Sequence, residues 1–534
     1  MNLSKDRARK AAVLLLGAAA YALLYALGSQ VEHSGGVLPG ATLARFAAAW
    51  PLALAVLAAL MRYALPRLAL RADAGACRPF PAALAFMLIF ACYVPLFLIE
   101  YPGSFMYDTQ AQTYQIARGQ YSMFHPLLHT LLLRACLSLY DLFGSFEKCA
   151  AVYSLLSMTV VSACFALVCG SVSRSVSRRA GWICTAFFCL YPAHMAFASN
   201  YTKDGMFAAC FALFAALCAE EVRTGGLTRG RRALQAAAGV LACLLRNNMV
   251  YAAAAWALLL LLRKKRYLRM ALWALAVVAL SRAANAGLGA YTHADRGNVA
   301  EMLSVPIQQL ARARVYAGET FTEEERTLMD EVCAYEPYGF TQVWNRYEPT
   351  LSDPVKNYLD TRVLTQKMPG LAAMWLRIGR ERPDIYLDAF LSLALPSYYP
   401  YGEYRVAQPY IEIGIQPGVL TAPFAQRPMT QPGRFEAART WLYENIYRTG
   451  MDDHPVMRWL FNTGFVYWLL LLFALYEMYC GRWASLAWML LPVLLWGTYL
   501  LGPVMQGRYL YPFICVLPLF ALRRFGAGAE GEVA

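Results

Sequence analysis

The stretch from Pro81 to Leu98 reads PAALAFMLIFACYVPLFL and contains no charged side chain. An α-helix rises 1.5 Å per residue, so about 20 apolar residues span the roughly 30 Å hydrocarbon core of a bilayer. We therefore expect this stretch to cross a membrane. Eleven further apolar runs, some of them short, are expected to do the same: Ala11 to Gly28, Leu43 to Met61, Ala151 to Gly170, Gly181 to Ser199, Phe207 to Ala219, Ala233 to Leu245, Met249 to Leu262, Met270 to Leu288, Trp459 to Met478, Ala484 to Val504 and Tyr509 to Leu522.

The composition of the whole chain excludes an ordinary soluble protein. Of the 534 residues, 59% are hydrophobic and 15% are charged, whereas soluble domains contain about 45–50% apolar and about 25% charged residues. The net charge is +14. In a soluble protein that charge would suggest a nucleic acid as partner, so its distribution along the chain decides how it is interpreted.

The basic residues alternate between the loops, as they do in membrane proteins with an excess of Lys and Arg on the cytoplasmic side. Twenty-three of them fall in the terminal segments and loops of one face, for example Arg174, Arg178 and Arg179, and five fall in the short loops of the other face. Both termini are therefore expected to be cytoplasmic. The five on the outer face are Arg118, Lys148, Lys203, Arg246 and Arg508.

This topology requires that residues 125–143 form a juxtamembrane helix rather than a thirteenth span. Arg134 lies inside this apolar stretch, and an Arg at the centre of a bilayer costs roughly 2.5–3.5 kcal/mol or more. We predict an all-α polytopic membrane protein with about twelve transmembrane helices in the plasma membrane. Its parts would be two additional helices in 1–80, a core in 81–288 with an outer loop at 99–124, an external domain in 289–456 and the last helices in 457–534.

The external domain is predicted to be mainly helical and does not bind nucleic acid. It contains 21 acidic and 16 basic residues, and an acidic surface lacks the basic stripe that nucleic acids require. Thr322 and Glu325 have the spacing of a capping box at a helix start. A helical pattern in 371–390 is interrupted at Pro383. The net positive charge of the chain therefore reflects its orientation in the membrane.

Two acids and three cations at the outer ends of the predicted spans are the candidates for chemistry. Asp108 follows the third span, Lys203 and Asp204 precede the sixth, and Arg246 and Arg508 lie in later outer turns. An Asp can act as general base towards a sugar hydroxyl, and two Asp can hold a divalent cation. Arg and Lys at the membrane boundary suit a phosphate ester with a lipid tail.

Each of these residues also has a purely structural interpretation. Asp108 can cap a helix, Lys203 and Asp204 can form a local ion pair, and the two arginines can extend to the membrane interface. His125 and His129 have the i, i+4 spacing of a metal pair, yet the sequence offers no third ligand near them. These interpretations compete with the functional one until the fold is known.

The outer loops resemble the GT-C superfamily of membrane glycosyltransferases over about residues 81–522. The resemblance rests on Tyr101-Pro102-Gly103, the outward Asp108, residues 121–128 (YSMFHPLL), the second outward acid Asp204, and residues 508–512 (RYLYP) at the last helix. Within that superfamily the chain is most similar to a poorly characterised bacterial family of polytopic proteins. The similar stretches are residues 306–312 (PIQQLAR), residues 352–356 (SDPVK) and the turn Thr202-Lys203-Asp204.

The resemblance implies an inverting glycosyltransferase that uses a polyprenyl-phosphate sugar at the outer face of the cell envelope. Asp108 and Asp204 match the catalytic acids, which are also the ligands of any divalent cation. The acceptor would be a glycan, a lipid or a protein. Transport of lipid-linked glycans is the alternative function, favoured by Arg45 and Arg282 inside predicted spans. The expected substrate-binding residues are Tyr107, Arg118, His125, Lys203, Arg246, Asn247, Arg508 and Tyr509.

Overall fold

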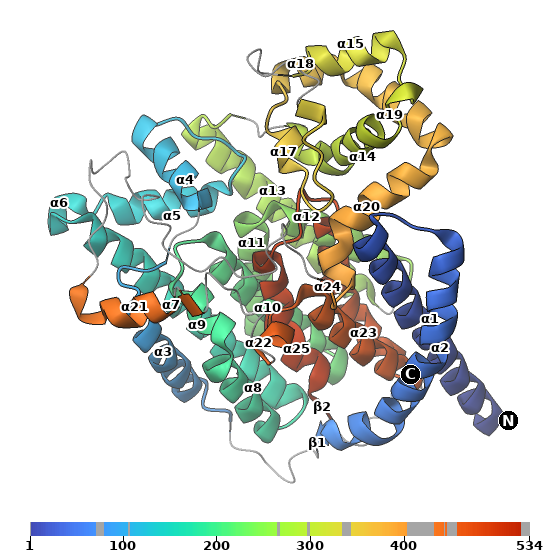
Figure 1. The fold of residues 1–534 in the computed structure, drawn as a ribbon. Coiled ribbons are helices and arrows are strands. Elements are labelled where there is room, and N and C mark those ends of the chain that lie inside the picture. Colours follow the sequence, from blue (N-terminus) through green and yellow to red (C-terminus); the bar gives the residue numbers. More distant parts are fainter. Residues whose placement is uncertain are drawn as a thin grey trace.

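The computed structural model shows a helical body with a smaller helical domain at one end (Figure 1). It describes residues 2–70, 79–104, 107–263, 267–295, 299–333, 343–402, 432–442, 444–445 and 456–524. Within these ranges the only strands that form a sheet are β1 (Ala69–Leu70) and β2 (Arg523–Arg524), which pair in parallel with Ala69 opposite Arg523. This short pairing ties the end of the second long helix to the end of the last one.

In the part of the chain that the structure describes, six helices are long and apolar enough to cross a membrane, or seven if a bent pair is counted as one span. The second of them continues through a π-helical turn, η1 (Leu60–Ala64), and a 3₁₀ turn, η2 (Leu65–Leu68). The predicted helical fold class is thus confirmed, with six or seven helices able to span a membrane where about twelve were expected. The six helices are α1 (Asn2–Ser34), α2 (Pro39–Ala59), α3 (Ala82–Ile99), α7 (Phe146–Ser175), α10 (Lys203–Thr224) and α13 (Leu268–Thr292).

The expected span from Gly181 to Ser199 is broken into two helices, α8 (Arg178–Leu190) and α9 (Pro192–Ser199), at an angle of 63°. Pro192 is the cause, because proline lacks a backbone N–H and restricts the residue before it to an extended conformation. Tyr191 is extended, with φ −74° and ψ 117°. The remaining apolar runs form shorter helices: α11 (Arg229–Leu245), α12 (Asn247–Leu261), α23 (Thr463–Tyr479), α24 (Leu486–Tyr499, preceded by η10, Trp483–Ser485) and α25 (Gly507–Ala521).

Helix α10 lies at the centre of the helical body and is enclosed by protein along nearly its whole length. It packs against α7, α11 and α25, and its many small residues allow this close approach. A Cβ atom on Gly205 would lie 2.2 Å from the carbonyl oxygen of Phe197, so only glycine fits there. The start of this central helix places Lys203 and Asp204 in the interior of the protein.

The segment expected to be one juxtamembrane helix over 125–143 forms two shorter helices. They are α5 (Leu127–Leu137) and α6 (Tyr140–Phe143), and Gly144 ends the second with φ +61°. The Arg134 guanidinium has a protein partner, because its Nη1 donates to the hydroxyl of Tyr121 at 3.1 Å. The preceding helix, α4 (Tyr107–Arg118), packs against α5.

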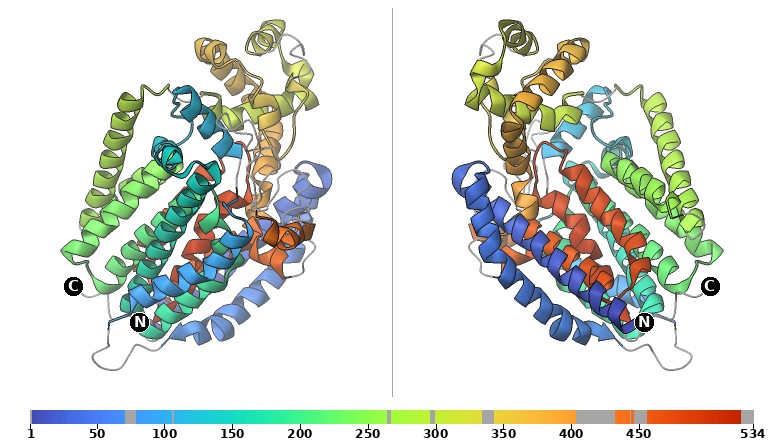
Figure 2. Two further views of the ribbon diagram at one scale, coloured as in Figure 1. Left: turned by 90° about the vertical axis from the view of Figure 1, so that its left-hand side faces the viewer. Right: turned by 90° about the vertical axis from the view of Figure 1, so that its right-hand side faces the viewer.

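The domain predicted to be external, which we continue to call the external domain, has its own hydrophobic core, formed by residues such as Ile307, Trp344, Met374 and Ile378. It lies at the end of the helical body opposite to the start of α1 (Figure 2). The predicted interruption at Pro383 is confirmed, because one helix ends at Glu381 and the next begins at Pro383. Its elements are η4 (Val299–Leu303), α14 (Ser304–Tyr316), η5 (Gly318–Thr320), α15 (Glu323–Glu331), α17 (Asp353–Lys356), α18 (Thr361–Gln366), α19 (Met368–Glu381) and α20 (Pro383–Tyr398). The structure also has η7 (Gly433–Phe435), α21 (Glu436–Leu442) and α22 (Met457–Leu460).

Several contacts hold the external domain against the helical body, and two of them involve α14 and the segment before α17. Buried Arg312 on α14 donates to Gly35 O at 2.6 Å, in the turn between α1 and α2, and to Tyr347 Oη at 2.9 Å. On the other side, Ser352 N donates to Pro503 O at 2.9 Å, in the turn between α24 and α25. The second contact brings the domain close to the outer end of α25.

The predicted capping box is present at the start of α15, where Thr322 accepts from Glu325 N and Glu325 accepts from Thr322 N. We expect Thr322→Ala to destabilise the protein by about 1 kcal/mol, because the Glu325 N–H loses its acceptor, the Thr322 hydroxyl. Thermal unfolding of the purified protein in detergent measures this change. Thr327→Ala, an exposed position in the same helix, is the control and should change the unfolding temperature less.

Candidate functional site

Asp108 lies between two cationic side chains from distant parts of the chain. Its Oδ2 accepts a hydrogen bond from Lys203 Nζ at 2.5 Å and another from Arg508 Nη1 at 2.9 Å. Asp108 is in the first turn of α4, Lys203 begins α10 and Arg508 is in the first turn of α25. All three side chains are largely buried. The starts of three helices therefore meet at one carboxylate.

A second acid is paired with the third cation. Asp204 Oδ1 accepts from Arg246 Nη1, and Oδ2 accepts from the Thr202 hydroxyl at 3.2 Å. Thr202 is the N-cap of α10, and Arg246 lies in the junction between α11 and α12. The Arg246 guanidinium is 4.6 Å from the centre of the Tyr509 ring, a cation–π geometry that also favours a buried guanidinium.

These contacts differ from the local ion pair and from the interfacial arginines that the sequence allowed. Lys203 and Asp204 do not pair with each other; Lys203 binds Asp108 and Asp204 binds Arg246. Arg246 and Arg508 are buried and bound by carboxylates, so their side chains do not extend away from the protein. The five side chains form one cluster, which we call the outer charge cluster: Asp108, Lys203, Asp204, Arg246 and Arg508.

The outer charge cluster contains three cations and two carboxylates, so its net formal charge is +1. Burial alone would raise the pKa of the Asp108 carboxyl, but the charges of Lys203 and Arg508 outweigh burial and hold that pKa well below its usual range. Asp108 is therefore an anion in this state and neutralises part of the cationic charge. A buried excess of positive charge favours the binding of an anion.

His125 lies beside the outer charge cluster as a neutral imidazole. Burial, together with the charges of Lys203 and Arg508, lowers the pKa of His125 to about 4, although Asp108 acts in the opposite direction. The residue is buried at the start of α5. At neutral pH it therefore contributes a polar group and no charge.

This neutral state predicts a pH dependence of stability. Between the ordinary pKa of 6.5 and about 4, the unfolded chain binds a proton at His125 that the folded chain does not bind. Stability should therefore fall as the pH drops through that range, by at most about 1.4 kcal/mol per pH unit from this group. Thermal unfolding at several pH values measures the slope. His125→Gln should have a shallower slope than the parent, and an unchanged slope would contradict the assignment.

A buried hydrogen-bond network lies next to the outer charge cluster and reaches it at Thr202. The His129 ring nitrogens lie 2.9 Å from Gln112 Oε1 and 2.7 Å from the Tyr153 hydroxyl, which is 3.1 Å from Thr202 O. Tyr153 has one hydroxyl proton, which it donates either to Thr202 O or to Nε2 of a neutral His129 that donates from Nδ1 to Gln112. The network links α4, α5 and α7 to the N-cap of α10. Both His129 nitrogens are occupied, so His125 and His129 do not form a metal pair.

Sequence reasoning did not identify Gln112 and Tyr153 as parts of this network. Gln112 follows Asp108 by four residues, which places both on one face of α4. Thr109 and Thr113 are also buried in this helix. This row of polar residues on one helix face could have predicted that Gln112 is part of a buried site. No sequence pattern predicts the role of Tyr153, because a tyrosine near the end of an apolar helix is common.

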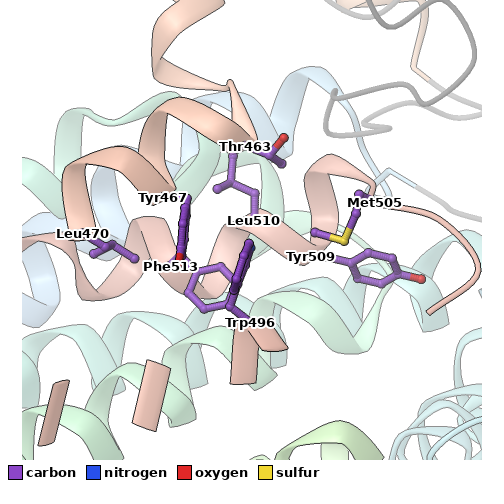
Figure 3. A pocket seen from close by; sticks show the side chains of 8 residues that line it. All are labelled: Thr463, Tyr467, Leu470, Trp496, Met505, Tyr509, Leu510 and Phe513. Carbon is purple, nitrogen blue, oxygen red and sulfur yellow. The ribbon is translucent and has the colours of Figure 1, made fainter. Parts of the chain in front are cut away.

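A narrow apolar pocket lies next to the outer charge cluster, between α23, α24 and α25 (Figure 3). The rings of Tyr467 and Trp496 stack in it with their centres 3.9 Å apart. Tyr509 lines the pocket and also contacts the Arg246 guanidinium. One aromatic ring thus joins an apolar surface to a cationic one. The pocket is lined by Thr463, Tyr467, Leu470, Trp496, Met505, Tyr509, Leu510 and Phe513.

Three of the predicted site residues are not placed in the outer charge cluster. Arg118 is exposed at the far end of α4, ten residues and about 15 Å of helix from Asp108. Asn247 is exposed at the start of α12, whereas its neighbour Asn248 donates to Thr498 Oγ1 at 3.3 Å. Tyr107 begins α4, but its side chain lies outside the described part of the structure.

The two acids do not fit a divalent cation in this arrangement. Within the described ranges, no group of three His, Cys, Asp or Glu side chains is placed to hold a metal ion. Asp108 and Asp204 are also each bound to cationic side chains, which would repel a metal ion brought between them. We therefore assign no metal-dependent step to this site.

Comparison with known proteins gives a family but no function. No curated protein and no solved structure matches the chain. Residues 120–530 match a protein family described as a "Family of unknown function (DUF6020)". The matched range includes four members of the outer charge cluster and excludes Asp108. Since it covers more than half of the 534 residues, the chain belongs to this family.

Proposed function

We propose that the protein is an inverting glycosyltransferase of the GT-C type that uses a polyprenyl-phosphate sugar at the outer face of the membrane. The observation that carries this proposal is the Asp108 carboxylate held by Lys203 and Arg508, beside the apolar pocket that shares Tyr509 with Arg246. This reaction needs a carboxylate that accepts a proton, cations that bind a phosphate and an apolar surface that binds a lipid tail.

The proposed orientation places both termini in the cytoplasm and the external domain outside the cell membrane. Twelve crossings satisfy the distribution of Lys and Arg, with α8 and α9 forming one bent span. The outer charge cluster then lies at the outer ends of its helices, because the turn between α24 and α25 contacts the external domain. A donor sugar that reaches the outer leaflet would meet the cluster at the membrane surface.

The donor phosphate is proposed to bind Arg508, Lys203 and Arg246. A phosphate accepts several charge-assisted hydrogen bonds, and the planar guanidinium binds two of its oxygens at once. The pocket beside Tyr509 has only about 10 Å³ of free space, so the first isoprene units would enter it only after its apolar side chains move apart (Figure 3). A ligand with both an anionic and an apolar end thus matches the two adjacent surfaces.

Donor binding would also prepare Asp108 for proton transfer. In the structure its pKa is far too low for an effective base, because two cations hold the carboxylate. A phosphate that attracts Lys203 and Arg508 weakens these ion pairs and adds a negative charge nearby, and both effects raise the pKa of Asp108. The carboxylate becomes a competent base when the donor is present.

The reaction follows from these positions. Asp108 takes the proton of an acceptor hydroxyl while the acceptor oxygen attacks the anomeric carbon. The bond from that carbon to the phosphate oxygen breaks, and its electron pair leaves with the polyprenyl phosphate. Arg508 and Lys203 stabilise the charge that develops on the leaving phosphate. Attack from the side opposite to the leaving group inverts the anomeric configuration.

The experiment that tests the function is transfer by the purified protein in detergent. A panel of polyprenyl-phosphate sugars is incubated with cell-envelope glycans, lipids and proteins, and release of polyprenyl phosphate is followed by mass spectrometry. Release that depends on an acceptor, with an inverted product, supports the proposal. Movement of an intact lipid-linked sugar across vesicle membranes, without bond cleavage, would contradict it and favour transport.

A further inference from the structure

A second charged cluster lies at the other end of the helical body. Helix α12 begins at Asn247, next to the outer charge cluster, and ends at Leu261, so α13 begins at the opposite end of the helices. Glu220 and Glu221, at the end of α10, are buried there. Four arginines surround these two acids: Arg174, Arg231, Arg232 and Arg269.

Three of the four arginines are engaged with their acids, and Arg269 is held most loosely. Arg232 is buried and binds both oxygens of Glu221, while Arg231 binds Glu220. Arg269 is different, because its side chain is 64% exposed and its Nη2 is 3.5 Å from Glu221 Oε1. Arg269 can therefore turn to another anion without leaving Glu221 unpaired.

Arg269 also lies at one end of a shallow groove of about 360 Å³ on α13, which is open along most of its surface. The other lining residues are Leu268, Leu272, Trp273 and Ala276. Positions 269, 272, 273 and 276 lie on one face of a helix, so the apolar residues follow the arginine along the helix axis. Helix α13 is at the edge of the molecule (Figure 2).

We propose that this groove binds one anionic phospholipid, with its phosphate on Arg269 and an acyl chain along Leu272, Trp273 and Ala276. Four arginines against two glutamates leave two formal positive charges, which complement an anionic headgroup. Tryptophan is enriched at the membrane interface, and basic sites between membrane helices bind anionic headgroups. The site is separate from the proposed transferase site and does not depend on it.

The test is lipid binding by the full-length protein. Protein purified in detergent is titrated with phosphatidylglycerol, which is anionic, or with phosphatidylcholine of the same chains, and bound lipid is counted by native mass spectrometry. We expect the parent to retain phosphatidylglycerol preferentially. Arg269→Ala should weaken its binding about fivefold, the effect of one arginine near a lipid surface, and Arg269→Lys should retain most of it.

Arg179→Ala is the matched control, because Arg179 is an exposed arginine at the same end of the helices, on α8. This variant should bind phosphatidylglycerol as the parent does. Equal retention of both lipids by the parent would overturn the proposal, as would an unchanged affinity in Arg269→Ala. Thermal unfolding of each variant shows whether a loss of lipid follows from a loss of structure, and Arg269→Lys separates the two causes.

Discussion

Replacement of Asp108 by Asn is expected to lower the rate of sugar transfer by about 10²- to 10⁴-fold, the usual contribution of a positioned general base. The carboxylate is the acid that Lys203 and Arg508 bind in the outer charge cluster. Asn has almost the same shape and keeps an oxygen that can accept from these cations, but it cannot take a proton from an acceptor. The initial rate of polyprenyl phosphate release measures the loss.

The control for this substitution is Asp141→Asn, which removes an exposed carboxylate from the neighbouring helix α6. It should transfer sugar at the parental rate. Size-exclusion chromatography and thermal unfolding establish that the Asp108 variant is folded, since two buried cations lose their anionic partner. A folded Asp108→Asn protein that transfers sugar as fast as the parent would exclude Asp108 as the base.

The second large effect is expected at Arg508. Arg508→Ala removes a hydrogen-bond donor that is already in place for the leaving phosphate, and the loss of such a donor typically slows a reaction by about 10²- to 10³-fold. Arg508 Nη1 now binds Asp108 at 2.9 Å. Donor turnover should fall strongly while the unfolding temperature changes little, because Lys203 continues to pair with Asp108.

Two variants make the Arg508 result specific. Arg508→Lys keeps the charge but loses the planar group, so it should recover part of the activity. Arg118→Ala removes an outer arginine that is exposed at the far end of α4 and should be close to neutral. Unchanged donor turnover in a folded Arg508→Ala protein would remove Arg508 from the donor site.

Hydrophobicity located the apolar helices of this protein, but it did not give their breaks. Every predicted run contains a helix, because apolar length is a direct consequence of burial in a membrane. The bend at Pro192 and the end of α5 at Leu137 depend on local backbone geometry. A prediction from average hydrophobicity therefore gives one continuous helix where the structure has two.

The members of the outer charge cluster were predictable, and their partners were not. The sequence placed Asp108, Asp204 and the three cations at one face of the membrane. Neighbouring residues on a helix point about 100° apart, however, and this separates Lys203 from Asp204. Lys203 meets Asp108, which is 95 residues away, and Asp108 meets Arg508, which is 400 residues away. Such pairings follow from helix packing, which no local pattern encodes.

The most direct test is the affinity of the purified protein for a polyprenyl phosphate, compared with the uncharged polyprenol of the same length. We predict saturable binding of the phosphate, weak binding of the polyprenol, and tighter phosphate binding in Asp108→Asn, because the internal carboxylate no longer competes for Lys203 and Arg508. Equal affinity for phosphate and alcohol, or weaker phosphate binding in a folded Asp108→Asn protein, would contradict a lipid-phosphate site at the outer charge cluster.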